Sequence, residues 1–221
     1  MICVPIMALD NAEAIKKMSE AAPLADLMEV RLDVMESDLK EIIQAATKPL
    51  IVTYRSKKEG GSGLARYETR VHHLVRAIEL GTDFVDVEFS MPQIYRQEIF
   101  QAGGTSRLIL SAHLSNKTPP SEKLEDIFRK MTATGADMVK IITYARAPED
   151  NLRVLGLIPL ARGLGIKIIA FCMGPAGRIS RIFTLMMGGY LSFASLEEGQ
   201  ESASGQIPVR KMKKLLEMLK A

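Results

Sequence analysis

The chain has 221 residues, of which 47% are hydrophobic and 25% charged, so it can build a sizeable core and is not a disordered chain. Lysine and arginine number 29 against 26 aspartates and glutamates, a formal charge of +3, and the two signs are interleaved along the whole length. With no tryptophan and 5% aromatic residues, this balance argues against a dedicated nucleic-acid surface.

The cysteine content and the first residues bear on the compartment. Cys3 and Cys172 lie far apart without a CxxC pair, so neither a disulfide framework nor a cysteine zinc site is indicated. The beginning of the chain lacks a basic region, and its apolar stretch stops at Asp10, too soon for a signal peptide. The longest apolar runs fall short of the ~18 to 20 residues needed to span a bilayer. We therefore expect a cytoplasmic protein that does not enter membranes.

Short β-like runs alternate with longer helical patterns along the chain. The first strand is expected over residues 2–7, and a helical pattern follows in which Ala14, Ile15 and Met18 recur at helical spacing. Further strands are expected at 26–32, 49–54, 83–89, 107–112, 137–142, 166–171 and 190–194. Each is followed by a helix-like segment, for example the amphipathic stretch from Leu64 to Leu80. Strands alternating with helices imply a parallel sheet covered by helices.

About eight such β-α units predict a (β/α)8 TIM barrel, forming one domain over residues 1–221. A doubly wound open sheet is the competing architecture. It is less well supported, because neither GxGxxG nor GxxxxGK followed by Ser or Thr comes after any predicted strand.

Polar residues interrupt the strands near their C-terminal ends, although strands buried on both faces should be almost entirely apolar. Residues two apart share a face of a strand, and the pairs are Glu29 with Arg31, Thr53 with Arg55, Asp86 with Glu88, Ser111 with His113, and Met138 with Lys140. In a barrel these strand ends meet at the face where active sites form. Alone, the first pair could be a structural ion pair, and the two acids of the third could be counterions of neighbouring bases. Together they indicate a functional site, since buried charges are costly without a partner or a charged ligand.

The residue types at these positions suggest carbonyl chemistry. Lys140 is expected among apolar neighbours such as Met138 and Ile142, where it loses hydration and the neutral amine is favoured. A neutral amine attacks a ketone or an aldehyde to form an imine. His113 on the preceding strand could then move a proton while Glu59 fixes its ring tautomer. Arginines offer bidentate recognition of a carboxylate or a phosphate.

A metal centre is not indicated by the sequence. No cluster of histidines or carboxylates has metal-ligand spacing, and His72 and His73 are expected on a helix away from the strand ends. The predicted chemistry is therefore free of metal.

Six short motifs lie on or directly after six of the predicted strands: Glu29-Val30-Arg31-Leu32-Asp33, Thr53-Tyr54-Arg55 with Glu59-Gly60-Gly61, Ser111-Ala112-His113, Ala136-Asp137-Met138-Val139-Lys140, Met173-Gly174 through Gly177 to Ser180-Arg181, and Ser202-Ala203-Ser204-Gly205-Gln206. In this order they resemble the motifs of type I 3-dehydroquinate dehydratases of the shikimate pathway. Each motif is weak by itself, but all six in order are highly specific. The resemblance spans nearly the whole chain.

The resemblance implies a reaction and a role for each matching residue. Lys140 would form a Schiff base with the C3 ketone of 3-dehydroquinate, and His113 would remove a C2 proton and then protonate the leaving C1 hydroxyl. Hydrolysis would release 3-dehydroshikimate, and Glu59 would orient His113. Arg181 would hold the substrate carboxylate. The other implied substrate-binding residues are Glu29, Arg31, Arg55, Ser202 and Gln206, with Met173 and Phe193 as apolar walls. No cofactor is implied, and the expected partners are the small-molecule substrate and a second copy of the chain in a homodimer.

Three features depart from the family pattern. Ser204 stands where the family usually has proline, which leaves the loop less rigid. Pro5 lies where some members place a serine that contacts substrate. The sequence also starts almost directly at the first strand, so the N-terminal hairpin that closes some of these barrels is expected to be absent.

The segment from Leu196 to Gln206 is expected to act as a lid. It contains two glycines, three acids and small polar residues, too little apolar material to pack by itself. Two other functions stay open. A Schiff-base aldolase would need a phosphate cradle, which the glycines between 174 and 177 with Ser204 and Gly205 could form. A catalytically inactive barrel that serves as a binding protein is the third reading.

Overall fold

The computed structural model describes residues 1–35 and 38–220. Its strands form one parallel sheet in the order β7-β6-β5-β4-β3-β2-β1-β8. The bounds are β1 Ile2–Ile6, β2 Leu27–Arg31, β3 Leu50–Thr53, β4 Phe84–Glu88, β5 Arg107–Leu114, β6 Met138–Tyr144, β7 Lys167–Met173 and β8 Ser192–Phe193. The (β/α)8 barrel predicted from the sequence is confirmed, and the open doubly wound sheet is not the architecture.

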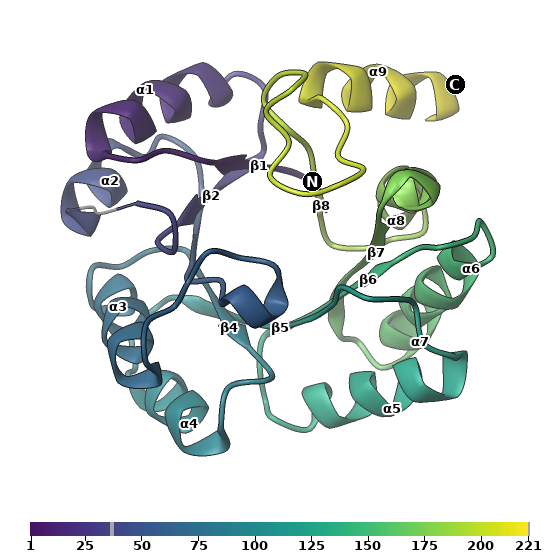
Figure 1. The fold of residues 1–221 in the computed structure, drawn as a ribbon, viewed down its shortest axis with the longest axis horizontal. Helices are drawn as coiled ribbons and strands as arrows, with labels where there is room; N and C mark the ends of the chain where they lie inside the picture. Colours follow the sequence, from purple (N-terminus) through teal and green to yellow (C-terminus); the bar gives the residue numbers. More distant parts are fainter. Residues whose placement is uncertain (36–37, 221) are drawn as a thin grey trace.

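Helices form a ring around the strands, and Figure 1 views the barrel along its axis. They are α1 Asn11–Ala21, α2 Leu39–Ala45, α3 Tyr67–Glu79, α4 Gln93–Gln101, α5 Ser121–Thr132, α6 Asp150–Leu155, α7 Leu157–Gly163, α8 Arg178–Met186 and α9 Val209–Lys220, with 3-10 turns η1 Lys57–Glu59 and η2 Pro175–Gly177. Sequence signals for helix ends fall at observed ends. The Asp10 side chain caps α1 by accepting from the Glu13 backbone N–H, and α5 begins directly after Pro120. No helix in the described part of the chain is long and apolar enough to cross a membrane.

The barrel is nearly closed. Strand β8 has only two residues, which pair with Ile2 and Cys3 of β1. Between β7 and the start of β8 the connection is a backbone hydrogen bond of 2.7 Å from the Tyr190 N–H to the Ile168 carbonyl. The shortness of β8 leaves more chain for the long segment between Phe193 and α9, which lies across the front of the barrel beside β1 in Figure 1.

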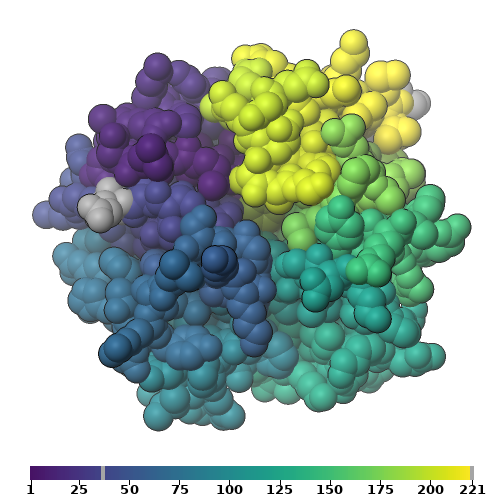
Figure 2. Space-filling view, viewed as in Figure 1, coloured from purple at the N-terminus to yellow at the C-terminus, as the bar shows by residue number. Residues whose placement is uncertain are grey.

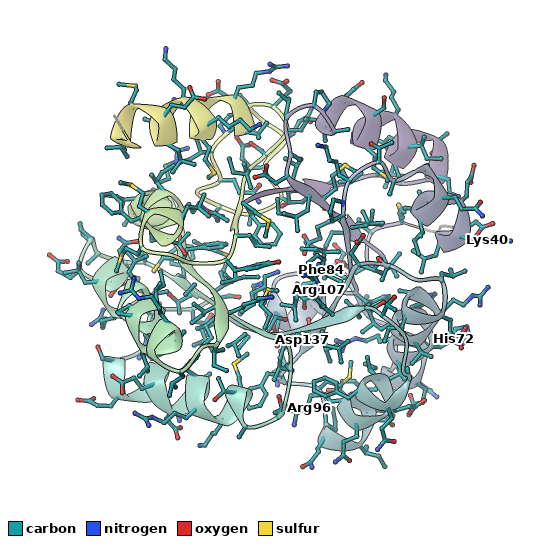
Figure 3. The ribbon with its side chains drawn as sticks, turned by 180° about the vertical axis from the view of Figure 1, so that it is seen from behind. Lys40, His72, Phe84, Arg96, Arg107 and Asp137 are labelled. Carbon is teal, nitrogen blue, oxygen red and sulfur yellow. The ribbon has the colours of Figure 1, made fainter. Side chains whose placement is uncertain are left out.

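Two apolar cores follow from the alternation of side chains along each strand. One lies between the sheet and the helices, and the other fills the barrel interior with residues such as Leu27, Ile51, Phe84, Ile109, Met138 and Ile169. Figure 3 views the barrel from the other end, where Arg107 and Phe84 lie near the centre. The Arg107 guanidinium stacks 4.1 Å from the centroid of the Phe84 ring. This apolar floor leaves the opposite end of the barrel for the polar residues.

Three strands extend two residues beyond their predicted ends. Strand β7 continues to Met173, and β5 and β6 continue to Leu114 and Tyr144. In β5 and β6 the hydrophobic runs stop earlier because polar residues such as His113 and Thr143 come at the ends of these strands, yet the parallel pairing of the two strands continues through them. His113 is therefore inside a strand, where its direction is fixed by the sheet.

Candidate active site

A pocket opens at the C-terminal end of the barrel. Its walls contain every site residue predicted from the sequence: Lys140, His113, Glu59, Glu29, Arg31, Arg55, Arg181, Ser202, Gln206, Met173 and Phe193. In Figure 2 the yellow C-terminal segment and the blue residues after β3 lie next to one another near the middle of this face. Residues that are far apart in the sequence therefore meet around one cavity.

Four further residues line the pocket that the sequence had not predicted as site residues. Ile142, expected only as an apolar neighbour of Lys140, and Phe171 lie two positions from Lys140 and Met173 on the same strands, so the period of two could have identified them as pocket residues. Gly60 and Ala203 lie within the quoted motifs but were given no role.

Lys140 lies at the boundary between the apolar floor and the polar mouth, and only 4% of it is exposed. Its Nζ donates to Oδ2 of Asp86 at 3.0 Å and lies 3.6 Å from Oε1 of Glu29. The Phe193 ring covers the nitrogen at 4.4 Å from its centroid. The sequence predicted apolar surroundings, and this is only partly right, because two carboxylates, from β2 and β4, reach the amine across the barrel interior.

Asp86 and Arg55 form the centre of a buried ionic network. Arg55 donates to Asp86 at 2.7 Å and to the Ser111 hydroxyl at 2.9 Å, and Glu59 and Glu88 lie within 3.4 Å of it. Burial opposes the charge of Arg55, but Asp86 and Glu88 outweigh this cost and raise the pKa of Arg55 above its ordinary value. The guanidinium thus holds three carboxylates from two elements, β4 and η1, together, while it also forms part of the pocket wall.

His113 is held by Glu59, which comes from the 3-10 turn after β3. Its Nδ1 lies 3.1 Å from Oε2 of Glu59, and its backbone N–H donates to the same oxygen at 3.1 Å. A carboxylate can only accept, so Nδ1 carries the proton and Nε2 keeps its lone pair. The Ser90 hydroxyl donates to the other oxygen of Glu59 at 2.5 Å. Ser90 follows β4 in no recognisable motif, and nothing in the sequence could have identified it.

The charge state of His113 follows from its surroundings. Burial, together with the positive charges of Arg55 and Lys140, lowers the pKa of His113 well below its usual value. The imidazole is therefore neutral near pH 7 and can accept a proton at Nε2.

Glu29 and Arg31 do not pair with each other, contrary to one reading of the sequence. Glu29 accepts from the Thr53 hydroxyl at 2.9 Å and faces Lys140, whereas Arg31 makes a bidentate pair with Asp33 at 2.7 and 2.8 Å. Asp33 also accepts from the backbone N–H groups of Arg55 and Ser62. Burial opposes this charge, but the bonds from Arg31 and from the backbone lower the pKa of Asp33. Asp33 thus connects Arg31 to the loop after β3 through hydrogen bonds.

Arg181 differs from the other pocket arginines because it has no carboxylate within ion-pair distance among the residues that the structure describes. It comes from α8, is 1% exposed, and donates to the carbonyls of Phe193 at 3.5 Å and Ser204 at 3.1 Å. Its guanidinium stacks over Phe171 at 4.6 Å, and its Nε has no hydrogen-bond partner. Burial lowers the pKa of Arg181 to about 9. Such a cation is suited to an anionic ligand.

The segment after β8 is folded against the mouth of the pocket. Ser202 and Gln206 bond to each other, with the Ser202 N–H donating to the Gln206 amide oxygen at 2.8 Å. The Gly174 N–H donates to the Ser204 carbonyl at 3.1 Å. Gly205 lies so close to this strand end that an added Cβ would be 2.3 Å from the Gly174 carbonyl oxygen, and its φ of 80° favours glycine. Whether the segment moves as a lid stays a prediction.

These contacts bear on the phosphate cradle that an aldolase would need. The Gly174 N–H is bonded to Ser204, and the Gly177 N–H donates to the Gly174 carbonyl at 3.0 Å. Backbone amides that bind a phosphate must be free to point at it. These two glycine N–H groups already have partners, so the geometry does not favour the aldolase reading.

No group of three or more His, Cys, Asp or Glu side chains among residues 1–35 and 38–220 is arranged to hold a metal ion. His72 lies at the outer rim of the barrel on α3 in Figure 3, away from the barrel axis, as the sequence predicted.

Comparison with known proteins identifies the family. The model of the type I 3-dehydroquinases matches residues 2–221. The chain belongs to this family. A 3-dehydroquinate dehydratase of Methanococcus maripaludis is 36% identical over 225 residues, which cover 99% of this chain and 100% of the relative. The 3-dehydroquinate dehydratase of Pyrococcus abyssi is 37% identical and covers 99% of this chain and 98% of its own length.

Solved structures of type I 3-dehydroquinate dehydratases share the fold. That from Clostridium difficile, crystallised with covalently modified comenic acid, has a TM-score of 0.90 at 28% identity and covers 99% of this chain and 91% of the other. The 3-dehydroquinate dehydratase from Geobacillus kaustophilus has a TM-score of 0.88 at 27% identity, with 99% and 90% covered. The family resemblance inferred from the six motifs is therefore confirmed.

Proposed function

We propose that this chain dehydrates 3-dehydroquinate to 3-dehydroshikimate through an imine on Lys140, with His113 as general acid and base. Membership of the type I 3-dehydroquinase family supports the reaction, a carbon-oxygen hydro-lyase step. The observation that carries the mechanism is the position of Lys140 and His113 on neighbouring strands. His113 pairs with Ile142, two residues beyond Lys140, so the imidazole lies one inward position nearer the mouth than the amine.

The steps follow from these positions. The Lys140 nitrogen bonds to C3 of the ketone, and the carbonyl oxygen leaves as water to give a protonated imine. The positive nitrogen withdraws electrons, which acidifies the hydrogen on C2. His113, neutral for the reasons given above, takes this proton at Nε2. It then returns a proton to the C1 hydroxyl, which leaves as water, and hydrolysis of the imine frees Lys140.

The rest of the pocket would bind and orient the substrate. Arg181 would hold the carboxylate, because it is the pocket arginine that lacks a carboxylate partner in the described chain. Ser202 and Gln206 would meet hydroxyl groups from the segment across the mouth, and Met173 and Phe193 would supply apolar contacts. Glu29, Arg31 and Arg55 would support the polar side of the ring, although Arg55 is already bonded to internal carboxylates. The homodimer and the cytoplasmic location stay predictions from the sequence.

Trapping the imine tests the proposal. Borohydride added during turnover of 3-dehydroquinate should reduce the imine and leave the mass of the reduced adduct on Lys140, found by peptide mass spectrometry. Lys140→Ala should abolish both the adduct and the growth of enone absorbance. Lys167→Ala removes an exposed lysine at the start of β7, far from the mouth, and should retain both. An unlabelled Lys140, or normal turnover in Lys140→Ala, would overturn the mechanism.

A further inference from the structure

Asp86 touches the reacting nitrogen without lining the substrate pocket. It lies in the middle of β4, paired with Thr53 of β3 and Ile109 of β5, and its side chain is completely buried. Oδ2 accepts from Lys140 at 3.0 Å, and Oδ1 accepts from Arg55 at 2.7 Å and from the Ser111 hydroxyl at 2.6 Å. Three donors therefore fix the carboxylate in one orientation.

This carboxylate stays ionised. Burial alone would raise the pKa of Asp86, but the charges of Arg55 and Lys140 outweigh it and hold the pKa well below its usual range. A carboxylate with such a low pKa is too weak a base to remove a proton from an ammonium group. Asp86 instead supplies a permanent negative charge beside the Lys140 nitrogen.

Imine formation leaves the charge on that nitrogen unchanged. An ammonium group and a ketone give a protonated imine and one water, so the nitrogen is positive before and after the step, and atoms and charge balance. Removal of the C2 proton needs the nitrogen to stay positive, because a neutral imine is a much poorer electron acceptor. A fixed anion at hydrogen-bond distance favours the positive form in both states.

We propose that Asp86 is a catalytic residue that keeps the imine nitrogen of Lys140 protonated while His113 removes the C2 proton. This inference rests on the proposed function. Its carboxylate acts by charge, in contact with the reacting atom, and meets no part of the substrate ring. The sequence suggested only a structural counterion, since nothing in the pattern shows which base an acid on β4 would meet.

Other titratable groups lie near the Lys140 nitrogen, and a pH-dependence test has to take them into account. Glu29 of β2 lies 3.6 Å away, and Cys3 of β1 and His113 of β5 are close enough for their pKa values to respond to its charge. Arg55, two residues after the end of β3, lies on the other side of Asp86. Glu29 shares the role of counterion at the longer distance, which is why loss of Asp86 should weaken the protonated imine and not abolish it.

The test compares two neutral replacements on β4. Asp86→Asn keeps the shape but removes the charge beside the nitrogen, so the alkaline limb of kcat should move to lower pH by about one unit or more. Near pH 7 we expect kcat to fall by about 10²-fold. Glu88→Gln removes a buried carboxylate that contacts Arg55 and Arg70 but not Lys140. Glu88→Gln should change kcat, but it should move the alkaline limb of kcat much less than Asp86→Asn does.

Two checks keep the outcome decisive. Borohydride labelling of Lys140 in the unmodified enzyme comes first, and its failure would overturn the proposed function itself. If labelling succeeds but Asp86→Asn and Glu88→Gln have the same alkaline limb, Asp86 is structural and only the present inference fails. If Asp86→Asn does not fold, infrared spectra of the imine accumulated in His113→Ala decide. A C=N band that shifts in D2O from pH 6 to 9 supports the inference, and a band without that shift overturns it.

Discussion

Replacing Arg181 by methionine should stabilise the protein without ligand while it weakens substrate binding. Arg181 is 1% exposed, and burial lowers its pKa from 12.5 to about 9. At about 1.4 kcal/mol for each pKa unit, this burial costs the charged form roughly 5 kcal/mol. As the pH falls from 12.5 to 9 the unfolded arginine is charged before the folded one, so stability decreases over that range and the full cost is present at pH 7.

Part of this cost is offset by contacts that the variant would lose. These are the hydrogen bonds to the Phe193 and Ser204 carbonyls and the stacking on Phe171, each worth about 1 kcal/mol. Replacing a buried charge by an apolar side chain of similar size is often stabilising by about 1–4 kcal/mol. We expect a gain of about 1–3 kcal/mol, which for a chain of this length raises Tm by about 2–12 °C. Loss of the charge that meets the substrate carboxylate should raise KM about 100-fold, equivalent to about 2.7 kcal/mol, with kcat changed far less.

Thermal unfolding followed by circular dichroism and steady-state kinetics with 3-dehydroquinate measure both effects. Arg178→Met is the matched control, since Arg178 lies one turn earlier on α8 and is exposed. It should leave Tm and KM almost unchanged. A lower Tm together with an unchanged KM in Arg181→Met would show that Arg181 is structural and refute the reasoning.

Two further variants, one pH profile and one exchange measurement address the proton transfer and the lid. His113→Ala should lower kcat by about 10²–10⁴-fold. Because the imine forms without the proton shuttle, this variant should also accumulate the covalent adduct, which mass spectrometry detects. Absence of the adduct would mean that His113 also takes part in forming the imine. Since burial lowers the pKa of His113, the acid limb of kcat/KM in the unmodified enzyme should lie below pH 6.5, and a limb above that value would contradict the neutral imidazole. Ligand binding should slow hydrogen exchange over residues 196–206, and equal exchange would remove the lid from the mechanism. Ser204→Pro keeps the carbonyl that bonds Gly174 and Arg181, and should tighten binding by about 0.4–1 kcal/mol; weaker binding would show that proline does not fit the closed backbone.

The position of the pocket could be predicted because a strand repeats every two residues. Glu29 and Arg31, or Ser111 and His113, share a face whatever the rest of the chain does, and parallel strands end at the same side of a barrel. The apolar residues that precede them, such as Ile51 and Phe84, close the floor below. Local spacing and a known architecture were therefore sufficient to bring these residues together.

The partners within the pocket could not be predicted in this way. Several acids face several bases, and the pairing depends on register and side-chain length in three dimensions. Arg31 pairs with Asp33 on its own chain segment, whereas Glu29 reaches Lys140 four strands away in sequence. The apolar environment expected for Lys140 was inferred from its own strand alone, and the carboxylates come from β2 and β4.

The pairing of the acids determines which arginine can take a substrate carboxylate. Arg55 already donates to Asp86 and Ser111, so an incoming carboxylate would have to replace an internal ion pair and leave Asp86 short of a partner. Arg31 has Nε and Nη2 bonded to Asp33. At Arg181 the same carboxylate adds an ion pair to a cation that burial has already desolvated, and nothing is displaced but contacts to two carbonyls. A substrate carboxylate therefore gains the most binding free energy at Arg181. The same difference in partners explains why the pKa of the buried Arg55 is raised and the pKa of the buried Arg181 is lowered.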